Sequence, residues 1–403
     1  MEHGFFYLAC VAAISRIGYE VISFRGKVTP LALYCFCYLY FCFGPYLANL
    51  LGFSIYSGIQ KAYLDEAAFV FFLAIITLTL FPANTLSRIE SPLALVVKSP
   101  KLVKQICLLA MALPVCALFA LAFARIGFSG MDKVQRIQAV GIVHYVLLTL
   151  WPLLLFILLT VTPRKALAGK EPWMVGGTVL LYFAYCFYMG ERDFALLALP
   201  LFFWLYKDHP ISTMKLALLA TGGVTAFTLM SLGRGNAFEG GGLSAFLNQG
   251  SNLMVTSNIL AWLEQGQQVM WGQSYFSGLV NMLTLGAIKL TLPLSIWFSR
   301  AYSPAANDGA YGFSIEGEAL INFGLAGVPF LFAFIALFLA VCYRGYLAGR
   351  PLGVLLTYFN LFYFIYAIRG ESLILFKSFI YCLILFFGLL MLSQRGRLYF
   401  RVA

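Results

Sequence analysis

Apolar runs of about twenty residues recur along this chain, and short polar connections separate them. The chain is 62% hydrophobic and 11% charged, whereas a soluble domain is about 45–50% apolar and about 25% charged. Inside a bilayer the backbone must satisfy its own hydrogen bonds, so runs of this length predict helices. We therefore expect an all-α fold, a polytopic helical bundle in the membrane. The first run has no basic stretch before it and is interpreted as a retained helix, not a cleaved signal peptide.

The pattern predicts about eleven transmembrane helices, of which the seventh is short. Their approximate limits are 5–22, 30–56, 62–82, 104–124, 139–161, 173–190, 193–206, 211–231, 318–342, 352–368 and 372–392. One long polar stretch, 232–316, is expected to form a single large loop that contains short helices. It separates an N-terminal bundle, 1–231, from C-terminal helices, 317–403, within one integrated membrane domain. The apolar segment 276–298 is interrupted by Lys289 and Pro293, so we expect it to lie along the surface.

The 27 Lys and Arg residues orient the bundle. Basic residues are concentrated in alternate connections, which include Arg25, Lys98, Arg164, Lys207, Arg344 and Arg395. Because cytoplasmic loops carry the excess of Lys and Arg, this side is predicted to be cytoplasmic. The N-terminus and the long loop then lie outside, and the C-terminus lies inside. The net charge of +11 is scattered over short loops, so we expect no nucleic-acid partner.

Four arginines on the predicted outer side stand at helix ends, namely Arg125, Arg192, Arg234 and Arg369. Each of them can extend toward lipid headgroups, but four at one depth favour a shared anionic ligand. The Arg192 guanidinium offers planar donors to a phosphate. Its neighbours Glu191 and Asp193 can instead neutralise it as an ion pair.

Several ionisable residues lie within or beside the apolar runs, where charge is costly. Arg16 and Lys377 lie inside predicted spans. His144 lies about one turn inside the outer end of the fifth span, where it is either a general base or a hydrogen-bonded partner between helices. Glu316 and Glu318 stand at the start of another run, where a helix N-terminus also favours acids. Side chains two positions apart diverge by about 200° on a helix, so these two acids are not expected to share one role.

Familiar cofactor motifs are absent from the sequence: there is no phosphate-binding GxxxxGK[ST], no GxGxxG and no HExxH. The nine cysteines all lie in apolar runs without a CxxC, which indicates packing residues. We therefore expect neither a metal nor another cofactor. The long loop is rich in Trp and Tyr, a composition typical of an interfacial belt and also of surfaces that stack on sugar rings.

Residues 314–327 read SIEGEALINFGLAG. This segment resembles the one that follows the large periplasmic loop in O-antigen and related polysaccharide polymerases (Wzy-type), which tends to show Ser, Glu, Asn-Phe and Gly-x-x-Gly. Arg234-Gly before the loop, the segments 271–275 and 292–297, and Arg369-Gly before the last helix are similar as well. The resemblance covers roughly residues 186–390. The chain departs from the usual Pro-Arg at Pro293, which Leu follows, and the next arginine is Arg300.

The resemblance implies an integral-membrane glycosyltransferase of the bacterial inner membrane. It would act at the periplasmic face and transfer a growing glycan from undecaprenyl pyrophosphate to a new lipid-linked repeat unit. Fixed cations would stabilise the pyrophosphate leaving group without a metal, and a base would take the proton of the acceptor hydroxyl. The expected substrate-binding residues are Arg192, Arg234, Arg369, Arg125, Lys377 and Asn322. The expected catalytic residues are Glu316, Glu318, Asp193 and His144, with Asp308 as a weaker alternative.

Implied partners are the lipid-linked oligosaccharide, the bilayer and a chain-length regulator protein. Two other functions remain open at this point. An O-antigen ligase uses the same kind of donor and differs in its product. A transporter or flippase of a lipid-linked or anionic solute would explain Arg16 and Lys377, but it predicts an internal repeat that the sequence does not show.

Overall fold

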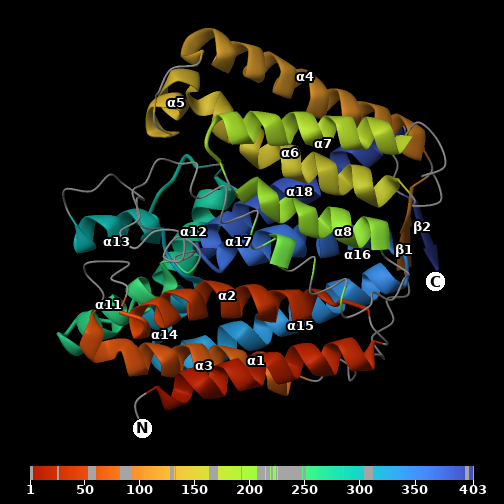
Figure 1. Ribbon diagram of the computed structural model, residues 1–403. Helices are drawn as coiled ribbons and strands as arrows, with labels where there is room; N and C mark the ends of the chain where they lie inside the picture. Colours follow the sequence, from red (N-terminus) through yellow and green to blue (C-terminus); the bar gives the residue numbers. More distant parts are fainter. Residues whose placement is uncertain are drawn as a thin grey trace.

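The computed structural model is built almost entirely from helices (Figure 1). It describes residues 3–24, 27–52, 60–81, 93–97, 99–127, 131, 133–162, 171–191, 193–206, 251–284, 286–303, 312–394 and 399–402, with scattered residues between 214 and 247. Within these ranges, seven helical segments are long and apolar enough to cross a membrane. The expected all-α, multi-pass membrane fold is therefore confirmed.

The long segments begin with α1 (Gly4–Ser23), α2 (Pro30–Leu50) and α3 (Leu64–Leu80), which a 3₁₀ turn at Lys61–Tyr63 precedes. They continue with α4 (Pro100–Ile126), α6 (Ile142–Val161), α15 (Gly327–Leu347) with its leading helix α14 (Ile315–Phe323), and α18 (Ser372–Ser393). Shorter apolar segments are α7 (Glu171–Tyr188), α8 (Ala198–Tyr206) after a 3₁₀ turn at Asp193–Leu197, and α16 (Pro351–Phe359). The predicted span 211–231 lies almost wholly outside the described residues, so the count of eleven stays a prediction.

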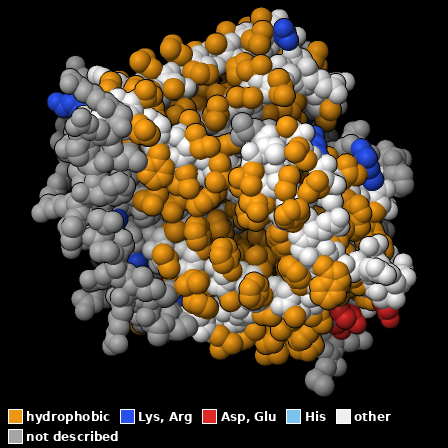
Figure 2. All heavy atoms as spheres, turned by 180° about the vertical axis from the view of Figure 1, so that it is seen from behind, with side chains coloured by type: hydrophobic (Ala, Val, Ile, Leu, Met, Phe, Trp, Pro, Cys, Tyr) orange, Lys and Arg blue, Asp and Glu red, His pale blue; other side chains and the backbone are white. Residues whose placement is uncertain are grey.

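The helices form two groups, and α16 contacts both of them. Helices α1, α2, α3 and α15 pack together, and α4 packs on α6 and α7. Helices α16 and α18 both contact α6, and α16 also packs along α15. Figure 2 shows hydrophobic side chains over most of the back face of the molecule, as expected for a surface in contact with hydrocarbon.

The two ends of the bundle differ in structure (Figure 1). One end, here the cap end, carries the N-terminus and the short helices α5 (Lys133–Val140), α11 (Asn252–Glu264), α12 (Gln273–Leu283) and α13 (Leu294–Tyr302). The other end, here the strand end, carries the C-terminus and an antiparallel pair of strands, β1 (Leu93–Val96) and β2 (Tyr399–Val402). Within the described part of 276–298 no helix is long enough to span a membrane, because α12 and α13 have only 11 and 9 residues.

The predicted ninth span, 318–342, is not one straight helix. Gly324 has φ +64°, a conformation that favours glycine, and the chain bends there between α14 and α15. A Cβ atom at Gly327 would lie 2.6 Å from the Ala319 carbonyl oxygen. Residues eight apart in a straight helix are about 12 Å apart along the axis, so α14 folds back onto the start of α15. This bend positions Glu316 and Glu318 inside the cap end.

Candidate functional site

The turn that leads into α14 is shaped by a hydroxyl cap and two glycines. Ser314 accepts a hydrogen bond at its Oγ from the Gly317 amide at 3.1 Å, which satisfies one free N–H of the first turn. Gly312 has φ +70° and lies against the Arg369 carbonyl oxygen. A Cβ at Gly317 would meet Val255 of α11 at 2.9 Å. The glycines therefore allow α14 to approach both α11 and the turn before α18.

Glu316 joins three segments that lie far apart in the sequence. Its side chain is fully buried, and Oε1 accepts a hydrogen bond from Asn252 Nδ2 at 2.7 Å. The same amide nitrogen donates to the Ile368 carbonyl oxygen at 2.7 Å. Glu316 Oε2 has no hydrogen-bond partner among the described residues. Tyr34 and Tyr38 of α2 are also buried and interact electrostatically with this carboxylate.

Glu318 acts as an N-terminal cap for α18, although it lies 54 residues earlier in the chain. Its Oε2 accepts from the Ser372 amide at 2.6 Å, and its Oε1 accepts from the Ser372 and Ser274 hydroxyls at 2.8 Å each. A carboxylate at this position satisfies free N–H groups and complements the helix dipole. Asn322 supports the arrangement, because its Nδ2 donates to Ser274 Oγ and to the Glu318 carbonyl oxygen, both at 2.7 Å.

Glu371 repeats this arrangement at α13. Its Oε2 accepts from the Leu294 amide at 2.5 Å, and its Oε1 accepts from the Ser295 hydroxyl at 3.0 Å. Burial raises the pKa of Glu371, although these donors oppose the shift. Glu318 and Glu371 line a cavity of about 20 Å³ between α12, α13, α14 and α18, a space for roughly one water.

Arg369 and Asp193, two residues of the predicted site, meet at the edge of this network. Arg369 Nη1 lies 3.4 Å from Asp193 Oδ1, and the two side chains are 20% and 27% exposed. The guanidinium also lies over the Phe41 ring of α2, 5.3 Å from its centroid. Arg369 directly follows Ile368, whose carbonyl Asn252 holds beside Glu316. The structure thus brings Arg369, Asp193 and Glu316 into one region of the cap end.

His144 lies in a separate network. It is fully buried, with Nδ1 2.8 Å from the Tyr185 hydroxyl and Nε2 3.3 Å from Glu191 Oε1. Glu191 also accepts a bond from Lys133 of α5 at 2.8 Å. Burial would raise the pKa of Glu191, but the His144 bond and the Lys133 charge outweigh burial and lower this pKa to about 2. The geometry corresponds to the alternative of a histidine hydrogen-bonded between helices.

Three other predicted cations do not join Arg369 in the structure. Arg125 is exposed and donates to the Ala139 carbonyl oxygen at 2.7 Å, beside α5. Lys377 is half-buried in the second turn of α18, where Lys289 and Glu371 interact with it electrostatically. Arg16 lies near the strand end, bonded to the Thr79 carbonyl oxygen in the last turn of α3. Three further predicted residues, Arg192, Arg234 and Asp308, lie outside the described residues.

Some residues of the network carried no signal in the sequence. Asn252, Ser274 and Ser372 are ordinary polar residues near helix starts, and their roles depend on contacts with segments far along the chain. The described ranges contain no group of three His, Cys, Asp or Glu side chains arranged for a metal ion. The side chains of the network around Glu316, Glu318 and Glu371 are carboxylates, hydroxyls and amides, and the Arg369 guanidinium lies at its edge.

Comparison of the chain with protein-family models, with curated proteins and with solved structures finds no match. The function of the protein is therefore inferred from the geometry of the cap end and from the sequence features described above. That geometry offers one partly exposed cation beside one partly exposed carboxylate, supported by a buried carboxylate framework.

Proposed function

We propose that this protein is an integral-membrane glycosyltransferase that polymerises oligosaccharide repeat units carried on undecaprenyl pyrophosphate. In this proposal the chain crosses the bacterial inner membrane eleven times, and its cap end faces the periplasm. The multi-pass helical fold and the segment 314–327 support it. The transferred glycan would belong to O-antigen or a related surface polysaccharide.

The observation that carries the proposal is the loose Arg369–Asp193 pair. At 3.4 Å it is longer than a charge-assisted hydrogen bond, which is typically about 2.7–2.9 Å. A loose and partly exposed pair costs little to separate. Meanwhile the Asn252 bond to Ile368 fixes the backbone beside Arg369. A pyrophosphate oxygen can therefore replace Asp193 on a guanidinium that is already oriented.

Exposure also distinguishes the four predicted bases. Glu316, Glu318 and His144 are 0%, 1% and 0% exposed, while Asp193 is 27% exposed. A base must reach the proton that it removes. We therefore assign the base to Asp193 and assign framework roles to Glu316 and Glu318.

The reaction then proceeds in one displacement. The acceptor hydroxyl oxygen attacks the anomeric carbon of the donor glycan, and its proton passes to the Asp193 carboxylate. The bond between the anomeric carbon and the pyrophosphate oxygen breaks, and both electrons leave with the pyrophosphate. Arg369 stabilises the negative charge that develops on this leaving group.

Reconstitution tests the proposal. The purified protein in proteoliposomes is incubated with a defined repeat unit on undecaprenyl pyrophosphate, and the glycan products are sized. A ladder of integral repeats with release of the carrier pyrophosphate is expected. Movement of the lipid-linked unit across the bilayer without chain growth would favour a transporter. Transfer only to an added lipid A core acceptor would favour a ligase, and both outcomes contradict polymerisation.

A further inference from the structure

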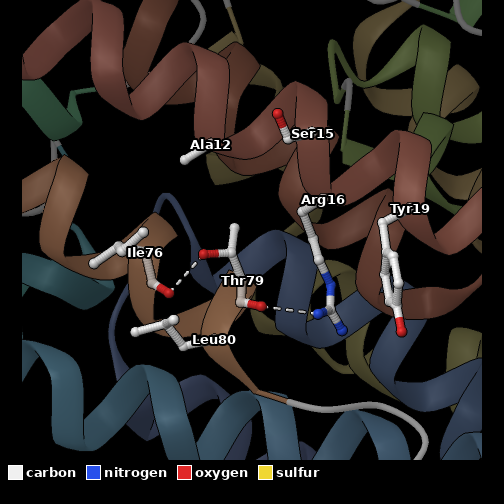
Figure 3. Close-up of a pocket in the computed structure, with 7 residues that line it drawn as sticks. All are labelled: Ala12, Ser15, Arg16, Tyr19, Ile76, Thr79 and Leu80. Atoms are coloured by element: carbon white, nitrogen blue, oxygen red, sulfur yellow. Dashed lines mark hydrogen bonds between the residues drawn. The ribbon is translucent and has the colours of Figure 1, made fainter.

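A cavity of about 470 Å³ opens on the surface between α1 and α3, away from the cap end. It is lined by Ala12, Ser15, Arg16 and Tyr19 from α1, and by Ile76, Thr79 and Leu80 from α3 (Figure 3). Arg16 is 4% exposed, so its guanidinium is built into the wall. The proposed glycosyl transfer uses none of these residues.

The Arg16 guanidinium links the end of α3 directly, and the start of α2 through Glu20. Its Nη1 donates to the Thr79 carbonyl oxygen at 3.0 Å, in the last turn of α3 (Figure 3). Its Nη2 donates to Glu20 Oε1 at 2.6 Å. Glu20 in turn accepts a bond from Thr29, the residue that caps the start of α2. A cation at a helix C-terminus and an anion at a helix N-terminus both complement the helix dipoles.

This arrangement fixes the depth of the cavity. Because α2 begins and α3 ends beside the Arg16–Glu20 pair, the pair lies at the edge of the membrane-spanning part of both helices. Around the cavity the outer surface is apolar, since Val11, Ile14 and Leu80 are 62%, 62% and 74% exposed. The cavity therefore opens toward the boundary between lipid headgroups and hydrocarbon.

The polar side chains of the lining are the hydroxyls of Ser15, Tyr19 and Thr79 and the Arg16 guanidinium. Arg16 Nη1 and Nη2 are bonded to Thr79 and Glu20 and its Nε is buried, while Ser15 and Tyr19 are exposed and carry hydroxyls. The Thr79 hydroxyl already donates to the Ile76 carbonyl oxygen. None of the described residues that line the cavity carries a carboxylate. Such a site suits a ligand with acceptor oxygens at one end and hydrocarbon at the other, because Ala12, Ile76 and Leu80 complete the wall.

We propose that this cavity binds a glycerophospholipid of the leaflet at the strand end. Its phosphodiester oxygens accept bonds from the hydroxyls of Ser15 and Tyr19, beside the positive charge of Arg16. One acyl chain follows the apolar side of the groove. Because Glu20 already balances the Arg16 charge, recognition depends on the phosphodiester together with the chain, and phosphate alone is not enough.

Photo-crosslinking tests this site. Phosphatidylglycerol with a photoactivatable acyl chain is added to the purified full-length protein, and the labelled peptides are mapped. Labelling is expected on the α1 and α3 segments that line the cavity. Ala12→Phe fills the groove and should lower this labelling by about tenfold, a loss of about 1.4 kcal/mol in binding. Gly177→Leu adds apolar bulk at an exposed position of α7, away from the cavity, and should leave labelling unchanged.

Three competitors identify the ligand chemistry. Excess unlabelled phosphatidylglycerol should remove the labelling, while glycerol 3-phosphate and diacylglycerol should not. If glycerol 3-phosphate competes fully, the site binds free phosphate; if diacylglycerol competes equally well, the headgroup contributes nothing. Either result overturns the proposal, as does labelling that Ala12→Phe leaves intact. Ser15→Leu also fills the groove. Protein with this substitution that elutes as a single species must show the same loss of labelling.

Discussion

At the scale of single residues, the side chains that react differ from the side chains that hold the structure around them. Asp193 is assigned to the first group, so Asp193→Asn should lower the rate of glycan extension by about 10²–10⁴-fold. Affinity for the lipid-linked donor should change little. The checks are initial rates and donor titrations on protein of equal purity. Asp65→Asn, at a carboxylate that is paired with His3 at the cap end, should retain the rate. An Asp193→Asn enzyme at the native rate would exclude Asp193 as the base.

Glu318 belongs to the second group. Glu318→Ala leaves the Ser372 amide and two hydroxyls without their acceptor. We expect a loss of about 2–5 kcal/mol in stability, because each buried donor left unsatisfied costs about 1–3 kcal/mol. The measurement is the thermal melting of purified protein in detergent, with hydrogen exchange at the start of α18. Glu66→Ala, at an exposed acid in the first turn of α3, is the matched control. Equal melting of both variants would show that the cap contributes nothing.

At the scale of elements, helix crossings depend on glycine. A Cβ at Gly345 of α15 would lie 2.8 Å from Gly353 Cα of α16, closer than real side chains approach. Gly345→Ala should therefore destabilise the protein by about 1–3 kcal/mol through overpacking. Gly388→Ala in α18 has open space around it and should be neutral or stabilising by about 0.5–1 kcal/mol. Melting temperatures show whether each substitution destabilises or stabilises the protein. A stabilised Gly345→Ala protein would contradict the close crossing of α15 and α16.

The sequence predicted elements better than contacts. Apolar runs identified the long helices, and the long loop was expected to contain short helices such as α11. Glu316 and Glu318 drew attention because charge beside hydrocarbon is costly. Their partners Asn252 and Ser372 could not be inferred, since those bonds join segments 64 and 54 residues away. The bend at Gly324 was also missed, because glycine is common in membrane helices whether or not they bend.

At the scale of the whole molecule, the orientation of the bundle in the membrane is the first property to measure. Trp271 is 80% exposed at the cap end, and Lys101 is exposed at the start of α4, toward the strand end. With cysteine at either position, a membrane-impermeant maleimide should label Trp271→Cys in intact cells and Lys101→Cys only after the membrane is opened. The unsubstituted protein reports labelling of its own cysteines. The reverse pattern would place the cap end in the cytoplasm.

The central claim is that Arg369 at the cap end binds the pyrophosphate leaving group of a polymerase. The most direct measurement is the product ladder made by Arg369→Ala protein in proteoliposomes, beside unsubstituted protein and Lys101→Ala. Loss of the interaction should lower the extension rate by about 10²–10³-fold, while Arg369→Lys should recover part of the rate and Lys101→Ala should match the native ladder. A full-length ladder at the native rate from Arg369→Ala protein would contradict the account.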